Sequence, residues 1–124
     1  MPLEEKIVQQ ITSNSITTLY LGDNEIGEDG AKDLAKALKI NKSITNLNLL
    51  RNKIGDAGMR DLAKALKNNR SITKLTLTDN QIEDDGVQAL AEALKVNYSI
   101  TYLELRYIVN QIELGDKECR NSFR

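Results

Sequence analysis

Side chains that could take part in catalysis or metal binding are few in this sequence. There is no histidine, the residue used most often for acid–base catalysis near neutral pH and for metal coordination. The one cysteine, Cys119, therefore has no histidine to activate it. The acidic stretch from Asp79 to Gly86 lacks the ligand spacing of a calcium loop, and Ile82 within it is expected in the core. We therefore expect a protein that is not an enzyme and that holds no catalytic residue, cofactor or metal.

Recognition of another protein is the chemistry that the remaining candidates support. Tyrosine and arginine are enriched among the residues that carry most of the binding energy at protein interfaces. By residue type, Tyr20, Arg51, Tyr102 and Arg106 are the leading candidates. These four residues can form one binding surface only if the fold places them on a common face.

A repeat runs through most of the chain. The tripeptide Ser-Ile-Thr begins at residues 15, 43, 71 and 99, with a constant step of 28 residues. Repetition at such a period is typical of a solenoid, in which each unit stacks on the next. Each tripeptide is followed by Leu-x-Leu, the alternation of a short half-buried strand. These pairs are Leu19 and Leu21, Leu47 and Leu49, Leu75 and Leu77, and Leu103 and Leu105.

A helix is predicted in the second half of each full repeat. Leu34, Ala35, Ala37 and Leu38 are spaced to line one helix face, and the next two repeats have the same pattern. Acidic residues at the start and lysines at the end suit the helix dipole. Gly30, Gly58 and Gly86 fall in the first turn, where we expect close approach to a neighbour. The acidic residues are Glu28, Asp56 and Asp84, and the lysines are Lys39, Lys67 and Lys95.

Stacking of these units predicts an α/β solenoid with parallel strands on one face and helices on the other. Helices need about 10 Å per neighbour and strands about 4.8 Å, so the strand face should be concave and the helix face convex. Outward strand residues then form rows across the concave face, free of core packing. We expect a protein partner to contact Thr18, Tyr20, Asn46, Asn48, Leu50, Arg51, Lys74, Thr76, Tyr102, Glu104 and Arg106.

The segment Ile16-x-x-Leu19-x-Leu21-x-x-Asn24, with copies starting at Ile44 and Ile72, resembles the leucine-rich-repeat motif. The 28-residue unit and the Leu-Ala-x-Ala-Leu helix are similar to the ribonuclease-inhibitor type, as found in NOD-like receptors. The resemblance covers residues 15 to about 112 and implies a right-handed βα superhelix. In that family the repeated asparagine bonds to the backbone of neighbouring turns. The resemblance therefore implies a structural ladder at Asn24, Asn52 and Asn80.

The expected organisation is a single domain, residues 1–124. Residues 3–13 are predicted to form an N-terminal capping helix, because Ile7, Val8 and Ile11 repeat the helix spacing. In the last unit Asn110 lies 30 rather than 28 residues after Asn80. The full repeats are 15–42, 43–70 and 71–98, followed by a partial repeat at 99–112 and an irregular cap or tail at 113–124.

The composition limits which classes of partner and which cellular compartment we expect. A formal net charge of -1 provides no field for nucleic acid or an anionic membrane, and no apolar run is long enough to cross a bilayer. A single cysteine and the absence of a signal sequence favour the cytoplasm. The preferred hypothesis is a non-catalytic module that binds a protein through its concave face. The alternatives are a regulator similar to Ran GTPase-activating proteins, or a fragment of a larger NOD-like sensor without independent activity.

Two further features have competing interpretations. Three of the four tyrosines, Tyr98, Tyr102 and Tyr107, lie in the last repeat, where they could cap the core or pair with a second copy. We accordingly expect a monomer or weak self-association through the C-terminal repeat. Asn41, Asn69 and Asn97 each begin a glycosylation sequon. Their equal spacing favours helix C-capping in the left-handed conformation over modification.

Overall fold

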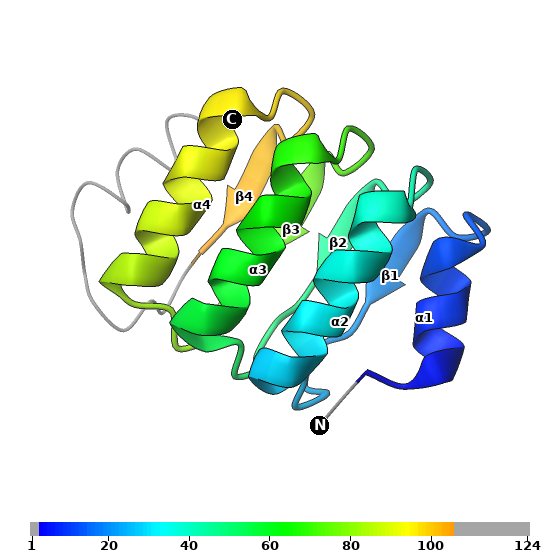
Figure 1. Ribbon diagram of the computed structural model, residues 1–124, viewed down its shortest axis with the longest axis horizontal. Coiled ribbons are helices and arrows are strands. Elements are labelled where there is room, and N and C mark those ends of the chain that lie inside the picture. Colours follow the sequence, from blue (N-terminus) through cyan, green and yellow to red (C-terminus); the bar gives the residue numbers. More distant parts are fainter. Residues whose placement is uncertain (1–2, 106–124) are drawn as a thin grey trace.

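The computed structural model describes residues 3–105, in which helices and strands alternate along the chain. Figure 1 shows the helices side by side in one layer with the strands behind them. This arrangement confirms the α/β solenoid predicted from the repeat. The elements are α1 (Glu5–Thr12), β1 (Thr18–Tyr20), α2 (Gly27–Ile40), β2 (Asn46–Asn48), α3 (Gly55–Asn68), β3 (Lys74–Thr76), α4 (Asp84–Val96) and β4 (Tyr102–Glu104).

The four strands form one parallel sheet in the order β1-β2-β3-β4. Leu19 pairs with Leu47, Leu47 with Leu75, and Leu75 with Leu103, so equivalent positions of successive repeats lie beside each other. Because side chains alternate across a strand, each of these leucines points toward the helices while its neighbours point outward. The sheet therefore aligns the outward residues repeat by repeat.

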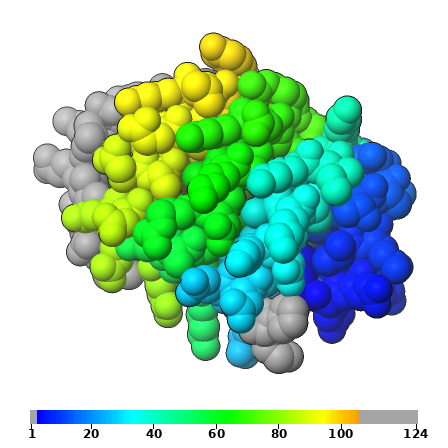
Figure 2. Space-filling view, in the orientation of Figure 1, coloured from blue at the N-terminus to red at the C-terminus, as the bar shows by residue number. Residues whose placement is uncertain are grey.

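The core lies between the helix layer and the sheet and is built from the repeated aliphatic positions. Leu34 and Leu38 of α2, Leu62 and Leu66 of α3, and Leu47 of β2 are all at most 2% exposed. Neither a strand nor a helix of one repeat could bury this surface alone. In the space-filling view the successive repeats form adjoining bands, which is how the apolar surface of each unit is covered (Figure 2).

The helix ends agree with the charge pattern of the sequence. Glu28, Asp56 and Asp84 lie in the first turns of α2, α3 and α4, and a lysine lies in the last turn of each helix. None of these helices has a side-chain hydrogen bond from its own N-cap residue. Instead, Asp56 Oδ1 accepts the amide N–H of Glu83 (2.7 Å) and of Gly86 (3.0 Å) at the start of α4. The carboxylate therefore caps the helix of the following repeat.

The two ends of the array differ in how the core is covered. At the N-terminal end α1 lies within the expected 3–13 segment, and its Ile11 is fully buried. At the other end Ala91 of α4 is exposed, whereas the equivalent Ala35 and Ala63 are buried by the next helix. The segment 113–124 and the second half of the expected partial repeat, residues 106–112, lie outside the described residues. No helix in the described part is long and apolar enough to span a membrane.

Two first-turn glycines lie where a side chain would meet the preceding repeat. A Cβ atom on Gly58 would lie 2.8 Å from Ile54 Cγ2 and 3.0 Å from Ala31 Cβ of α2. A Cβ on Gly86 would lie 2.6 Å from Asp56 Oδ1, the atom that caps α4. These distances are shorter than van der Waals contact, so both positions require glycine for packing. The expected role of Gly58 and Gly86 is confirmed.

Gly58→Ala tests this packing, because helix propensity alone would make alanine about 1 kcal/mol better than glycine. We expect a net loss of about 1–3 kcal/mol in the free energy of unfolding, since the buried Ile54 and Ala31 cannot move aside. Denaturant unfolding measures the change. Gly22→Ala is the control, because its Cβ would meet Leu50 at an ordinary 3.7 Å. A Gly58→Ala protein as stable as the parent would show that the helices do not pack this closely.

Candidate functional site

The outward side chains of the four strands form two rows that match the predicted ones. Thr18, Asn46, Lys74 and Tyr102 are register partners, and so are Tyr20, Asn48, Thr76 and Glu104. We call these eight residues the strand face. The observed pairing joins residues that are 28 positions apart, which confirms the predicted alignment of equivalent residues in each row. Their role in binding stays a prediction.

Aromatic and basic groups are the most prominent part of the strand face. Tyr20 is 66% exposed and Tyr102 is 44% exposed, and both lie at outward positions of the sheet. Lys74 Nζ lies 5.1 Å from the centre of the Tyr102 ring, within the range of a cation–π contact. The Tyr102 hydroxyl also donates to Glu104 Oε1 at 3.4 Å. Lys74, Tyr102 and Glu104 are therefore in contact with one another on the β3–β4 side of the face.

Some predicted binding residues are less available than the sequence indicated. Thr76 is only 6% exposed, because its short side chain lies between the longer Asn48 and Glu104. The expectation that Thr76 is a free surface residue is wrong. Asn48 is half-buried, and its Oδ1 accepts the backbone N–H of Leu50 at 3.0 Å. Leu50 is also half-buried, and Arg106 lies outside the described residues.

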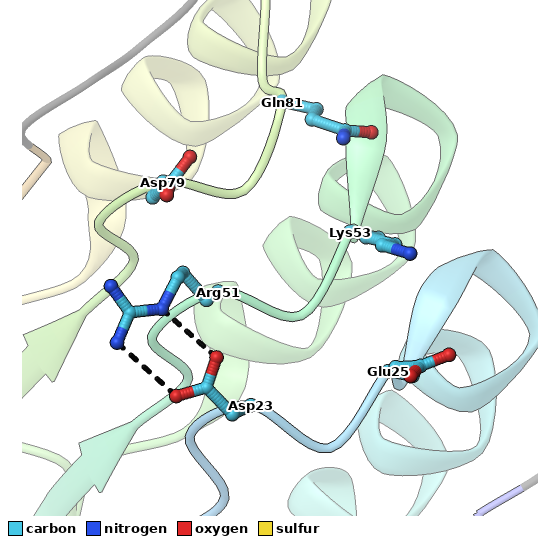
Figure 3. Close-up of a pocket in the computed structure, with 6 residues that line it drawn as sticks. All are labelled: Asp23, Glu25, Arg51, Lys53, Asp79 and Gln81. Atoms are coloured by element: carbon cyan, nitrogen blue, oxygen red, sulfur yellow. Dashed lines mark hydrogen bonds and ion pairs between the residues drawn. The ribbon is translucent and has the colours of Figure 1, made fainter.

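Arg51 lies beyond the strands, in the turn that follows β2. Its Nε and a terminal nitrogen donate to the two carboxylate oxygens of Asp23, at 2.9 and 3.2 Å (Figure 3). The hydrogen bond from Arg51 lowers the pKa of the Asp23 carboxyl below its usual value, and the same bond raises the pKa of the guanidinium. Both side chains are more than half exposed, so the pair contributes little to stability. Arg51 remains accessible to a partner.

The turns after the strands enclose a shallow hollow of about 260 Å³. Three turns contribute two residues each, one before and one after the repeated asparagine. The sequence singled out Arg51 as a candidate, but sequence reasoning missed the outer members of this group, Glu25, Lys53 and Gln81. The available signal was the constant 28-residue spacing of positions 25, 53 and 81. The hollow is lined by Asp23, Glu25, Arg51, Lys53, Asp79 and Gln81.

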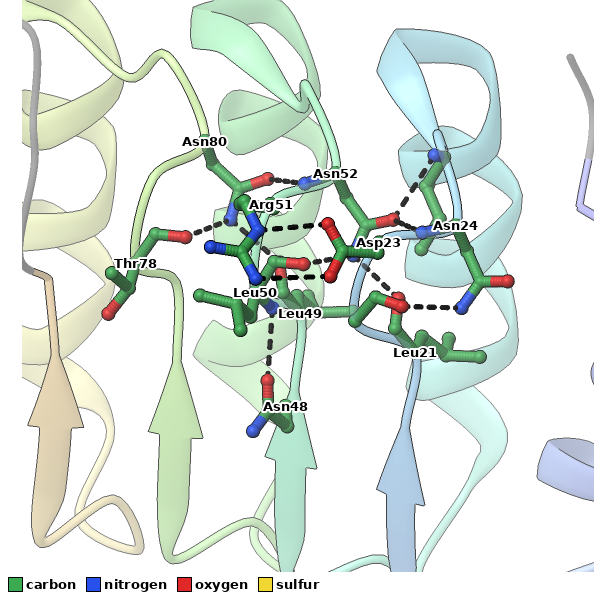
Figure 4. Close-up of polar contacts among 12 residues, drawn as sticks. Leu21, Asp23, Asn24, Asn48, Leu49, Leu50, Arg51, Asn52, Thr78 and Asn80 are labelled. Carbon is green, nitrogen blue, oxygen red and sulfur yellow. Dashed lines mark hydrogen bonds and ion pairs between the residues drawn. The ribbon is translucent and has the colours of Figure 1, made fainter.

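Buried asparagines connect these turns to one another (Figure 4). Asn52 Oδ1 accepts the N–H groups of Asn24 (2.8 Å) and Ile26 (3.3 Å), while its Nδ2 donates to the Leu21 carbonyl at 2.7 Å. Asn80 makes the same contacts one repeat later, with Asn52 N–H at 2.8 Å. The ladder implied by the sequence resemblance is thus confirmed. Asn24 is the exposed first asparagine of the ladder, and its side-chain Nδ2 donates to the Gly22 carbonyl at 3.1 Å.

A second ladder lies after the helices, at Asn41, Asn69 and Asn97. These residues have extended backbones rather than the left-handed conformation expected, so the C-capping prediction is wrong in its geometry. Asn69 Nδ2 donates to the Leu38 carbonyl near the end of α2, and Asn97 Nδ2 donates to the Leu66 carbonyl of α3. Each side chain therefore satisfies a helix end of the preceding repeat. All three are buried, which also argues against glycosylation there.

A family comparison identifies this pattern. The leucine-rich-repeat model matches residues 12–35, 41–63 and 68–91, together more than half of the chain. The chain belongs to the leucine-rich-repeat family. A search of curated protein sequences gives no match.

Solved structures share the leucine-rich-repeat fold at low sequence identity. A structure described as leiomodin-1 actin-binding site 2 is 22% identical with a TM-score of 0.79, covering 94% of this chain and 70% of that one. The tropomodulin C-terminal domain of Caenorhabditis elegans is 12% identical with a TM-score of 0.61, covering 96% and 90%. At these identities the likeness shows the fold alone.

Within residues 3–105 no three acidic or cysteine side chains come together in a group that could hold a metal ion. Cys119 and Tyr107 lie outside the described residues. Tyr98 is 82% exposed and so covers little of the core, contrary to a capping role for that ring. The surfaces that remain are the strand face and the turns beside it.

The asparagine ladder can be tested by comparing two of its rungs. Asn52→Ala leaves the N–H groups of Asn24 and Ile26 and the Leu21 carbonyl without their partner, and we expect a loss on the order of 2–4 kcal/mol. Asn24→Ala removes one exposed hydrogen bond and should change stability by less than about 0.5 kcal/mol. Thermal or denaturant unfolding of both variants measures the difference. Equal losses would mean that the buried amide does not support the turns.

Proposed function

We propose that this leucine-rich-repeat protein is a non-catalytic interaction module that binds a protein partner through its concave strand face. The supporting observation is the exposure of Tyr20 and Tyr102 on a rigid parallel sheet. A tyrosine gives a large contact area with few rotatable bonds, so little conformational entropy is lost when it is ordered. Asn46 and Lys74 between them add polar groups that can fix the orientation of a partner.

The exposed residues of the strand face combine apolar, charged and neutral polar groups, as protein interfaces do. Tyr102 with the nearby Lys74 presents an apolar ring beside a positive charge, and Thr18 and Asn46 continue the same row as neutral polar groups. Hydrophobic anchors with a polar surround are the usual anatomy of a protein interface. Thr76 contributes little of this contact area because it is buried. We infer that the anchors are Tyr20, Tyr102 and Arg51.

Actin is the first partner to test. The leiomodin-1 structure that shares this fold is named as an actin-binding site, although a sequence identity of 22% supports only a shared fold. Purified actin can be mixed with the protein directly, without a search for unknown ligands. Binding of a different protein through the same face would leave the proposed function intact.

Other parts of the proposal concern subtype and assembly. We propose that the chain is of the ribonuclease-inhibitor type, which the constant 28-residue step between paired strand positions and the helix after each of β1, β2 and β3 support. We also propose that the protein is cytoplasmic, and that it is a monomer or self-associates weakly through the C-terminal repeat, where the core is only partly covered. Leu94 and Leu105 there are half-buried, whereas the equivalent Leu66 and Leu77 are buried. A GTPase-regulator role and a sensor fragment remain the alternatives.

The function is tested with a Tyr20→Ala/Tyr102→Ala protein. Crosslinking with mass spectrometry identifies the partners of the parent protein, and titration with the purified partner, or with actin, measures affinity. Loss of two anchors should weaken binding at least tenfold, because each anchor is expected to contribute more than about 1 kcal/mol. Tyr98→Ala is the matched control, since Tyr98 is exposed but lies outside the strand face. Equal affinity of the double variant and the control would contradict the use of this face.

A further inference from the structure

The turns after β1, β2 and β3 contain six residues in an unfavourable backbone conformation. Asp23, Glu25, Arg51, Lys53, Asp79 and Gln81, which we call the turn cluster, all have positive φ, from 50° at Glu25 to 61° at Asp79. The left-handed region disfavours residues with a side chain by about 1–2 kcal/mol each, somewhat less for aspartate. Glycine adopts it freely, and this chain does use glycine at Gly27 and Gly55, with φ of 65° and 69°. The turn cluster therefore has residues with side chains at six positions where glycine would suit the backbone conformation better.

The ladder explains the backbone conformation but not the side chains. In each turn the two residues with positive φ flank the ladder asparagine, whose carboxamide must reach the neighbouring turn. None of Glu25, Lys53 or Gln81 makes a side-chain hydrogen bond or ion pair with another of residues 3–105. A structural requirement for these long polar groups is thus missing in the described part of the chain. Residues kept in strained conformations commonly serve a functional site.

The charges of the turn cluster are ordered along the solenoid. The row Asp23–Arg51–Asp79 and the row Glu25–Lys53–Gln81 both have a basic residue in the middle repeat (Figure 3). Asp23 already pairs with Arg51, and the charge of Asp79 also acts on the guanidinium. Glu25 and Lys53 make no ion pair with another of residues 3–105, and they border the hollow together with Asp79. A complementary surface would place an acidic group at the centre and basic groups on both sides.

We propose that the turn cluster is a second protein-binding site, which takes an extended segment with the charge order basic, acidic, basic at alternate positions. Each turn joins a strand to a helix, so successive turns should be separated by a distance between the strand spacing of about 4.8 Å and the helix spacing of about 10 Å. Alternate residues of an extended chain are about 6.6 Å apart, which falls within this range. The acidic residue of the segment faces Lys53, and the flanking basic residues face Glu25 and Asp79. The site lies beside the strand face and shares Arg51 with the proposed anchors, but it does not use the tyrosines. Loss of peptide binding and loss of partner binding through Tyr20 and Tyr102 can therefore be told apart.

The probe is the blocked peptide Lys-Ser-Asp-Ser-Lys, titrated into the isotope-labelled full chain and followed by amide chemical shifts. We expect saturable shifts at residues 23–25, 51–53 and 79–81, at low ionic strength because exposed charges are screened by salt. The isomer Asp-Ser-Lys-Ser-Lys has the same net charge in another order and should bind several-fold more weakly. Equal shifts from both peptides would reduce the effect to general charge attraction and overturn the proposal.

Matched glycine variants separate binding from stability. Lys53→Gly should lose most of the peptide-induced shifts while its Tm is equal to or higher than that of the parent, because glycine relieves the left-handed strain. Gln81→Gly makes the same backbone change without removing a charge and should retain the shifts. A lower Tm for Lys53→Gly would assign this side chain a structural role and contradict the inference. The Tyr20→Ala/Tyr102→Ala protein should bind the peptide normally, which distinguishes this site from the strand face.

Discussion

The structure depends on side-chain amides that bridge the backbones of neighbouring repeats. At one end of each strand Asn52 and Asn80 accept two N–H groups and donate to carbonyls of the adjacent turn. At the other end Asn69 and Asn97 bind the last carbonyls of the preceding helix. Turns and helix ends would otherwise leave buried polar groups without partners, which is energetically unfavourable. These contacts allow strands of only three residues to stack in one register.

A fixed register has direct consequences for recognition. Because equivalent residues are aligned across the sheet, a substitution at one exposed outward position changes one site in a row of the strand face. The strand face has two exposed tyrosines, and the turn cluster beside it has ordered charges. The same asparagine that forces the turns into left-handed conformations also places Arg51 and Lys53 at their tips. Scaffold and surface are therefore linked through the turn backbone.

The repeated positions explain why so much of the fold could be predicted from sequence. Leu47 recurs every 28 residues with its neighbours, so strand, helix, register and core follow from one period. Contacts that depend on how far a side chain extends could not be predicted from the repeat period. Asn41, Asn69 and Asn97 have the right spacing for a C-cap, but their carboxamides extend to the preceding repeat. Thr76 is outward by pattern, and its burial depends on the lengths of the residues on either side.

Amide hydrogen exchange, measured residue by residue, tests the bridging asparagines most directly. Asn24, Ile26, Asn52 and Ile54 lie in turns without regular secondary structure, yet each donates its N–H to an asparagine Oδ1 of the next repeat. Glu25 and Lys53 lie between them and have no acceptor for their N–H among residues 3–105. The account predicts slow exchange at the four bonded positions and fast exchange at Glu25 and Lys53. Uniformly fast exchange through these turns would contradict it.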